Sequence, residues 1–213
     1  MKQKFPRIAF FLAWDDEFSP IKHQNAAAFF NNARLVNLNQ VDSLGRVIIA
    51  AEKRKEPSGI VLQDFSLGVG QWKGAGMAGG PYRTNDVMFG SAQSVKSGLE
   101  LSTTKYPTLY SRDKSTFRLS GRTRMIAHVG LAPWGLPNGG SVSAKLYVLA
   151  GSSWTWYDSG VVVLKSGTLS AITFDLTRLS ANQLNDVQEI GVQFISNVDG
   201  GQTTVYLSYI TAE

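Results

Sequence analysis

The segment Val142-Ser143-Ala144-Lys145-Leu146-Tyr147-Val148 decides the fold class, because polar or amphipathic side chains alternate in it with apolar ones. Alternation with a period of two is typical of a β-strand that has one face in a core and the other towards solvent. The pattern therefore predicts a half-buried strand on which Lys145 and Tyr147 leave the core together.

A second segment, Ile190-Gly191-Val192-Gln193-Phe194, alternates in the same way. Its outward residues are Gly191 and Gln193. If the two strands lie in one sheet, the outer face of that sheet offers an aromatic ring, a cation and an amide on a surface that glycine keeps low.

Strand-like apolar runs continue on both sides of these segments, and clusters of Gly, Asn, Ser or Pro separate them. Many short strands at a spacing of about 8 to 15 residues predict an all-β fold, an antiparallel β-sandwich of the jelly-roll kind. The runs are residues 60–65, 86–89, 98–102, 115–119, 123–131, 141–149, 153–157, 161–164, 169–176, 189–195 and 203–210.

The first part of the chain has a different pattern. Residues 7–13 are continuously apolar, as in a buried parallel strand, and Ser19-Pro20 begins a helix that ends near Asn31-Asn32. One strand and one helix cannot bury themselves, so we expect residues 1–43 to be a piece of a larger α/β domain. Residues 44–59 read as a charged linker, and residues 60–213 as the sandwich.

Composition excludes several classes of site and partner. The 213 residues include no Cys and two His, which excludes a disulfide scaffold and a thiol nucleophile and argues against a zinc site. The net charge of +5 is dispersed, with 9 basic and 6 acidic residues in 1–59 and 12 and 10 in 60–213, so we expect no nucleic-acid partner. No apolar window reaches about 18 residues, so we expect no membrane span. Residues 14–17, Trp-Asp-Asp-Glu, interrupt the first apolar run, so we expect no signal peptide in this sequence.

Tryptophans are the most informative candidates for binding. Trp154 and Trp156 are two residues apart, so on a strand both indoles project from one face about 6 to 7 Å apart, which matches adjacent sugar rings. Pyranose C–H faces pack on such flat π-systems. Trp72 and Trp134 lie in loops framed by glycine or proline. The alternative for each is a position in the core or at one end of the sandwich.

Polar candidates would hydrogen-bond the edge hydroxyls of a sugar. They are Lys145, Tyr147, Gln193, Arg124 and His128. The acids of the sandwich are scattered beside turn residues and show no pair of the kind that glycoside hydrolysis needs. Asp64, at the end of the first strand, is a candidate oxygen ligand for one structural Ca²⁺.

The stretch from Ile8 to Ala26, with Trp14 and Pro20 inside it, continues through residues 30–32 to Val36-Asn37. It resembles the C-terminus of a β-mannanase catalytic domain of glycoside hydrolase family 26, which is a (β/α)8 barrel. The resemblance implies that Trp14 is a sugar platform after the last barrel strand, and that the catalytic glutamates lie on earlier strands outside this chain.

The rest of the chain resembles mannan-binding carbohydrate-binding modules of families 23 and 27. The motifs are Gln63-Asp64-Phe65, residues 70–72, 146–154, 172–176, 187–194 and 200–210. The resemblance implies that Trp72 and Trp154 stack on sugars in a cleft. The family carries an acidic calcium ligand near the end of its last strand, where this chain has Ser208-Tyr209. This departure puts the inherited calcium site in doubt.

Together these patterns favour a non-catalytic module that binds β-mannan, glucomannan or galactomannan, as a monomer secreted within a larger extracellular endo-β-1,4-mannanase. Two alternatives stay open. One is a jelly-roll polysaccharide lyase or hydrolase, which needs two convergent acids or a Tyr with a basic residue in a groove. The other is a basic β module for nucleic acids or anionic glycans, whose affinity would fall steeply with salt.

Overall fold

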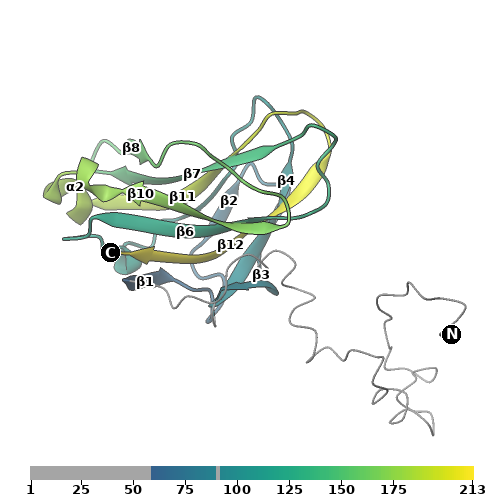
Figure 1. Ribbon diagram of the computed structural model, residues 1–213. Coiled ribbons are helices and arrows are strands. Elements are labelled where there is room, and N and C mark those ends of the chain that lie inside the picture. The colour runs from purple at the N-terminus through teal and green to yellow at the C-terminus, as the bar shows by residue number, and fades with distance from the viewer. Residues whose placement is uncertain (1–58, 90–91) are drawn as a thin grey trace, which may run out of the picture. The chain divides into compact units, whose positions relative to one another are not determined.

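The computed structural model describes residues 59–89 and 92–213. This part of the chain forms two antiparallel sheets that pack face to face (Figure 1). Sheet A has the strand order β10-β6-β12-β4-β3, and β1 also pairs with β12. Sheet B has the order β2-β5-β11-β7-β8, and β9 also pairs with β7. The predicted β-sandwich is therefore confirmed.

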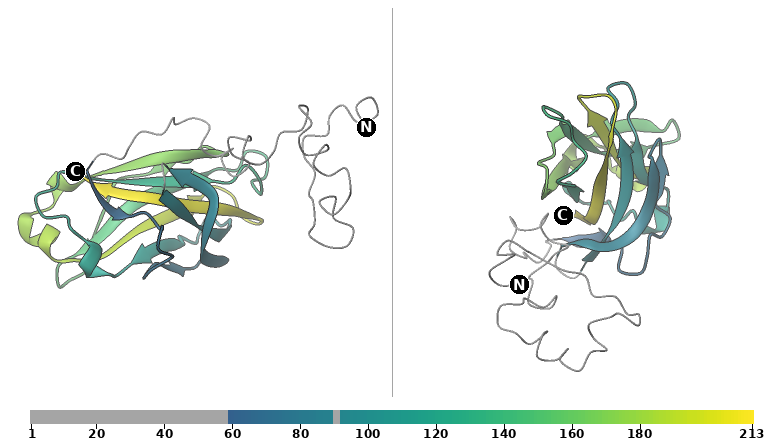
Figure 2. Two further views of the ribbon diagram at one scale, coloured as in Figure 1. Left: turned by 90° about the horizontal axis from the view of Figure 1, so that it is seen from below. Right: turned by 90° about the vertical axis from the view of Figure 1, so that its right-hand side faces the viewer.

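Each sheet combines strands that are distant in sequence, and Figure 2 shows the sandwich from two further sides. The strands of sheet A are β1 (Ile60–Gln63), β3 (Gly79–Phe89), β4 (Ala92–Glu100), β6 (Arg124–Leu131), β10 (Thr168–Asp175) and β12 (Gln202–Ala212). Those of sheet B are β2 (Lys73–Ala75), β5 (Thr108–Ser111), β7 (Val142–Ala150), β8 (Thr155–Asp158), β9 (Val162–Val163) and β11 (Val187–Ser196).

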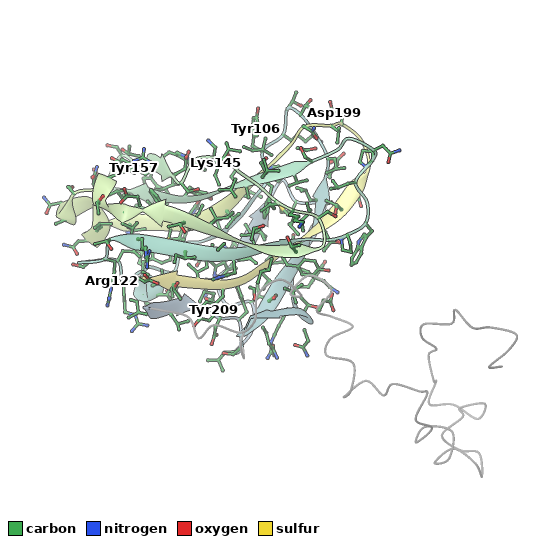
Figure 3. All side chains as sticks on the ribbon, in the orientation of Figure 1. Tyr106, Arg122, Lys145, Tyr157, Asp199 and Tyr209 are labelled. Carbon is green, nitrogen blue, oxygen red and sulfur yellow. The ribbon has the colours of Figure 1, made fainter. Side chains whose placement is uncertain are left out.

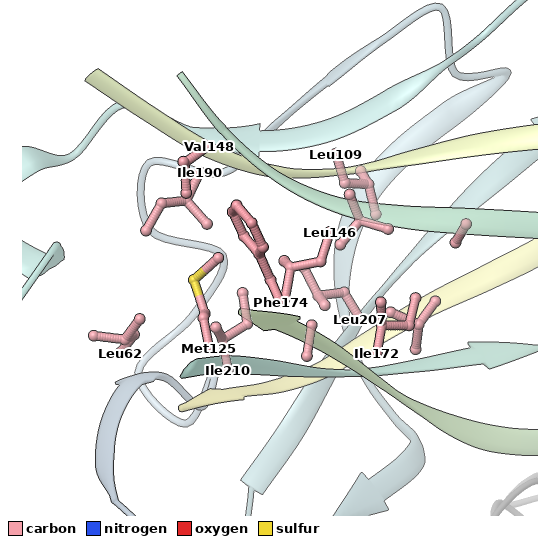
Figure 4. Packing of buried hydrophobic residues seen from close by; sticks show 14 of the residues in the cluster. Leu62, Leu109, Met125, Leu146, Val148, Ile172, Phe174, Ile190, Leu207 and Ile210 are labelled. Carbon is pink, nitrogen blue, oxygen red and sulfur yellow. The ribbon is translucent and has the colours of Figure 1, made fainter. Parts of the chain in front are cut away.

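The core lies between the sheets, and the alternation in the sequence explains which side chains enter it. Leu146 of β7 faces Phe174 of β10 and Leu207 of β12 in this layer, and all three are fully buried (Figure 4). Lys145, the neighbour of Leu146, points to the outer face of sheet B as predicted (Figure 3). Burying apolar surface on one side of each sheet leaves the two outer faces for other contacts.

Three short helical segments connect strands. The 3₁₀-helix η3 (Lys114–Thr116) begins at Asp113, whose carboxylate accepts hydrogen bonds from Ser115. The strand expected at residues 115–119 is therefore wrong: the local Asp cap satisfies the backbone in another way. The others are η4 (Leu176–Arg178) and α2 (Ala181–Asn185).

The predicted barrel remnant at 1–43 and almost all of the predicted linker at 44–59 lie outside the described residues, and so does Trp14. Within residues 59–89 and 92–213, no helix is long and apolar enough to cross a membrane.

Candidate functional site

The outer face of sheet B is built from one row of residues that crosses the sheet. Strand register places side by side Lys73 of β2, Tyr110 of β5, Gly191 of β11, Tyr147 of β7 and Asp158 of β8. All of them point away from the core because they occupy alternate positions of their strands. The predicted pairing of Lys145 and Tyr147 with Gly191 and Gln193 on one face is confirmed, and Gln193 lies directly opposite Lys145.

Gly191 leaves the middle of this face without a side chain of its own. A Cβ atom on Gly191 would come within 2.5 Å of the ring of Tyr147, a distance that real Cβ contacts do not reach. The phenol ring therefore lies across the space that a side chain would fill. Glycine at this position lets Tyr147 lie against the sheet, where only 1% of the residue is exposed.

Glu189 anchors the Tyr147 ring and Arg112 at the same time. The Tyr147 hydroxyl donates to Glu189 Oε1 at 2.7 Å, and Arg112 Nε donates to Oε2 at 2.6 Å. Glu189 is only 5% exposed, and these charge-assisted bonds give each of its oxygens a hydrogen-bond partner. The ion pair with Glu189 raises the pKa of Arg112 further above its usual value.

Trp156 of β8 covers the ring of Tyr147. The two rings stack with centroids 3.9 Å apart and planes 15° apart. The indole Nε1 of Trp156 donates to Asp158 Oδ2 at 2.7 Å, and Lys145 Nζ lies 3.2 Å from the same oxygen. Trp156 stays 38% exposed, so a held, flat aromatic surface faces solvent at this edge of the sheet.

Trp154 reaches the same face from a turn. The expectation that Trp154 and Trp156 share one strand is wrong, because β8 begins at Thr155 and Trp154 has a left-handed φ of 52°. Its N–H closes the turn on the carbonyl of Gly151. The guanidinium of Arg112 lies 5.0 Å from the centroid of the Trp154 ring and 5.1 Å from that of Tyr110. Trp154 is 43% exposed and therefore offers a second aromatic surface.

A hollow of about 470 Å³ opens beside Arg112, towards β2 and η3. Its lining combines an aromatic ring with amide, hydroxyl, ammonium, guanidinium and carboxylate groups. The lining residues are Gln71, Lys73, Tyr110, Arg112, Asp113, Lys114 and Ser115.

The structure places the other predicted residues elsewhere. Trp72 is 6% exposed and packs edge-on against Phe65 in the core, so its ring is not on the surface where a sugar would stack. Trp134 is 56% exposed but lies in the loop between β6 and β7, whereas Trp154 follows the far end of β7. Nine strand residues, about 27 Å, separate those two ends.

Arg124 and His128 belong to β6 in sheet A, so they do not meet the residues of sheet B. Arg124 forms an ion pair with the side chain of Glu213. His128 is 8% exposed, and burial lowers its pKa to about 4. The sequence predicted Arg124 and His128 as hydrogen-bonding partners for a sugar, but the pairing of β6 with β10 and β12 places them in the other sheet.

Two ionisable groups on the outer face of sheet B, Tyr147 and Asp158, have pKa shifts opposite to those that acid–base catalysis requires. Burial and the hydrogen bond to Glu189 raise the pKa of Tyr147, so its phenol stays protonated near neutral pH and does not supply a phenolate base. Burial disfavours the charged form of Asp158, but hydrogen bonds from Trp156, Gly160 and Lys145 outweigh it and lower the pKa of this carboxyl. A general acid needs the opposite shift. These groups are arranged to hold rings and accept hydrogen bonds.

Asp64, the predicted calcium ligand, uses one carboxylate oxygen in a local turn, and the structural Ca²⁺ stays a prediction. Asp64 Oδ1 accepts hydrogen bonds from the backbone and hydroxyl of Ser66. Ser208, where the resemblance to families 23 and 27 implies an acidic ligand, has a buried hydroxyl without a hydrogen-bond partner. Calcium takes six to eight oxygen ligands from carboxylates, backbone or amide carbonyls and waters. Among the described residues, no three His, Cys, Asp or Glu are grouped to hold a metal ion.

Comparison with known proteins agrees with this architecture. Residues 63–209 match the family described as "Mannanase, galactose-binding domain-like". The chain belongs to this family. The finer assignment to binding-module families 23 and 27 stays a prediction, as does the barrel remnant.

One relative of this family member is the mannan endo-1,4-beta-mannosidase A and B of Caldalkalibacillus mannanilyticus, with 30% identity over 215 residues. The alignment covers 99% of this chain but only 38% of the relative. A solved non-crystalline cellulose specific carbohydrate-binding module, CBM28, has a similar fold, with a TM-score of 0.54, 10% identity and coverage of 78% of this chain and 99% of that one. A second carbohydrate-binding module of the β-sandwich superfamily gives a TM-score of 0.50 and 16% identity, covering 75% and 64%.

Sequence reasoning missed four residues that hold this site together. Tyr110 and Arg112 belong to or follow β5, a strand too short to stand out. Glu189 continues the outward series of Gly191 and Gln193, and that alternation was the available signal. Asp158 is one of the acids beside turn residues, a position that side-chain capping alone would explain. Its Oδ1 does accept the N–H of Gly160, but its Oδ2 also holds Trp156.

Proposed function

We propose that the outer face of sheet B binds a β-mannan, glucomannan or galactomannan chain as a non-catalytic module of a secreted mannanase. The main observation in support is a pair of half-exposed indoles, Trp154 and Trp156. One buried carboxylate, Glu189, holds both of them through its bonds to Arg112 and Tyr147. Family membership and the mannosidase relative support mannan as the ligand.

The chemistry of this face suits a neutral sugar chain. Flat ring faces stack on the C–H faces of pyranoses, while Lys145, Asp158 and Gln193 offer donors and acceptors to the hydroxyls at the ring edges. Fixed rings lose little conformational freedom on binding, so more of the contact energy appears as affinity. With two stacking rings we expect a Kd between about 1 mM and 1 µM.

Affinity electrophoresis in gels that contain soluble mannan tests this function. We expect wild-type protein to be retarded, and Trp154→Ala and Trp156→Ala to lose most of the retardation. Trp134→Ala is the matched control, since it removes an exposed indole at the other end of β7 and should migrate like wild type.

Circular dichroism should show that all three variants stay folded. Equal retardation of wild type and both sheet B variants would overturn the assignment of the site. Product release from mannan or alginate by the pure protein would favour the jelly-roll enzyme instead, and binding that disappears with salt would favour a ligand with negative charge.

A further inference from the structure

The hollow of about 470 Å³ beside Arg112 is not used by the two tryptophan surfaces. Arg112 lines it and also lies over the ring of Trp154, so the hollow begins where the Trp154 surface ends. Its volume falls within the range of small-ligand sites in proteins, about 300 to 1,000 Å³.

The position of the hollow continues the row of residues across sheet B. Lys73 of β2 lies opposite Tyr110, and Tyr110 lies opposite Gly191, so the hollow occupies the β2 side of the sheet while Trp156 occupies the β8 side. Four strand spacings separate β2 from β8, which is about 19 Å. A sugar chain that stacks on Trp154 and Trp156 can therefore extend over Arg112 towards β2.

The lining is suited to a neutral, hydroxyl-rich ligand. Gln71 supplies both a donor and an acceptor, and Tyr110 supplies an aromatic wall. Among the described residues Lys73 and Lys114 form no ion pair, so their ammonium groups are available to hydroxyl oxygens. The carboxylate of Asp113 adds an acceptor for the hydroxyls of the ligand.

We propose that this hollow is an additional subsite, which binds a neutral sugar residue of the same chain beyond Arg112. The inference rests on the proposed function, because it places the tryptophan surfaces and the hollow along one ligand. Arg112 then contacts the sugar chain between the tryptophan surfaces and the hollow. The affinity becomes dependent on the length of the sugar chain.

Calorimetric titration with linear manno-oligosaccharides of three to six units tests the subsite in the full 213-residue chain. For wild type we expect the affinity to rise about five-fold or more between the shortest and the longest chains. The double variant Lys73→Ala/Lys114→Ala should bind the trisaccharide like wild type and lose most of that gain, and Gln71→Ala should lose part of it.

The control variant Lys105→Ala/Lys165→Ala removes the same charge from two exposed lysines outside the hollow and should keep the full gain. The subsite is wrong if the hollow variant gains as much with length as wild type, or if uronic acid oligosaccharides bind more tightly than neutral ones. Failure of all chain lengths to bind would instead overturn the proposed function itself. Thermal unfolding midpoints within about 2 °C of wild type would show that the exposed substitutions leave the fold intact.

Discussion

Arg112 Nε lies 2.6 Å from Glu189 Oε2, and the opposite oxygen of the same buried carboxylate accepts the hydroxyl of Tyr147 at 2.7 Å. Arg112 lies over Trp154, and Tyr147 stacks under Trp156. One carboxylate therefore supports both indoles that face solvent on sheet B. Removing it should loosen two surfaces at once, although Glu189 itself is too buried to contact a polysaccharide.

Glu189→Gln tests this support. The amide keeps an acceptor for Tyr147 but loses the charge that pairs with Arg112, so we expect a loss of about 1–2 kcal/mol in the free energy of unfolding. The exposed side chain of Arg112 keeps this cost below that of a fully buried pair. Mannan affinity should fall about ten-fold because both rings become less fixed. Chemical denaturation and calorimetric titration measure the two effects.

Glu100→Gln is the matched control for that substitution. Glu100 pairs with Lys105 between two exposed side chains, so its loss should cost less than about 0.5 kcal/mol and leave binding unchanged. If both Gln variants lost the same stability and the same mannan affinity, the supporting role of Glu189 would be contradicted.

Gly191→Ala tests the space that Gly191 leaves in the middle of the face. The added methyl meets the Tyr147 ring at 2.5 Å, so the ring has to move and its stack with Trp156 is disturbed. We expect destabilisation of about 1–3 kcal/mol and a clear loss of mannan affinity. Gly79→Ala adds the same methyl where nothing lies within 4 Å and should be close to neutral. A Gly191→Ala protein that binds like wild type would contradict the placement of the ring.

Asp158→Asn tests the acceptor below Trp156. The carboxylate holds the indole N–H and Lys145 together, and the lowered pKa shows that the charged form is favoured in the fold. We expect about ten-fold weaker binding, measured by titration near pH 7. Asp199→Asn removes a carboxylate that holds Thr103 in a different loop and should leave the affinity unaltered. Equal loss in both variants would indicate a general effect of charge.

The dependence of stability on pH follows from His128. Burial lowers its pKa from 6.5 to about 4, so between these values the unfolded chain binds a proton that the folded chain does not. Stability should fall by up to about 3 kcal/mol as pH decreases through this window. Carboxylates with lowered pKa, such as Asp86 and Asp158, add further losses only below about pH 4.

His128→Gln should show a smaller decrease between pH 6.5 and pH 4 than wild type. Denaturant titrations at several pH values measure the difference. Parallel curves for the two proteins would show that His128 is not the group responsible.

The fold was readable from the sequence because alternation reports directly on burial. Lys145 and Gln193 point outward and Leu146 points inward, as their positions indicated. Short segments were less readable. The three residues of β2 and the four of β5 carry too few positions for a pattern to emerge, and sheet partners secure them instead.

The site was only partly readable, for reasons that lie in backbone conformation and strand pairing. The left-handed φ of Trp154 removes it from the strand that its spacing with Trp156 suggested. Trp72 lies between Gly70 and Gly74 in the sequence, but its ring turns inward onto Phe65. Glu189 and Arg112 are 77 residues apart, so their contact depends on β11 pairing with β5, which no local pattern reports.

The most direct test of the central claim is an NMR titration of the five tryptophan indole N–H signals with linear mannopentaose. Single Trp→Phe variants assign the signals. We expect those of Trp154 and Trp156 to shift with the same saturating dependence on ligand, while those of buried Trp72 and distant Trp134 stay in place. Shifts confined to Trp72 or Trp134, or no saturable shift at Trp154 and Trp156, would contradict mannan binding on the outer face of sheet B.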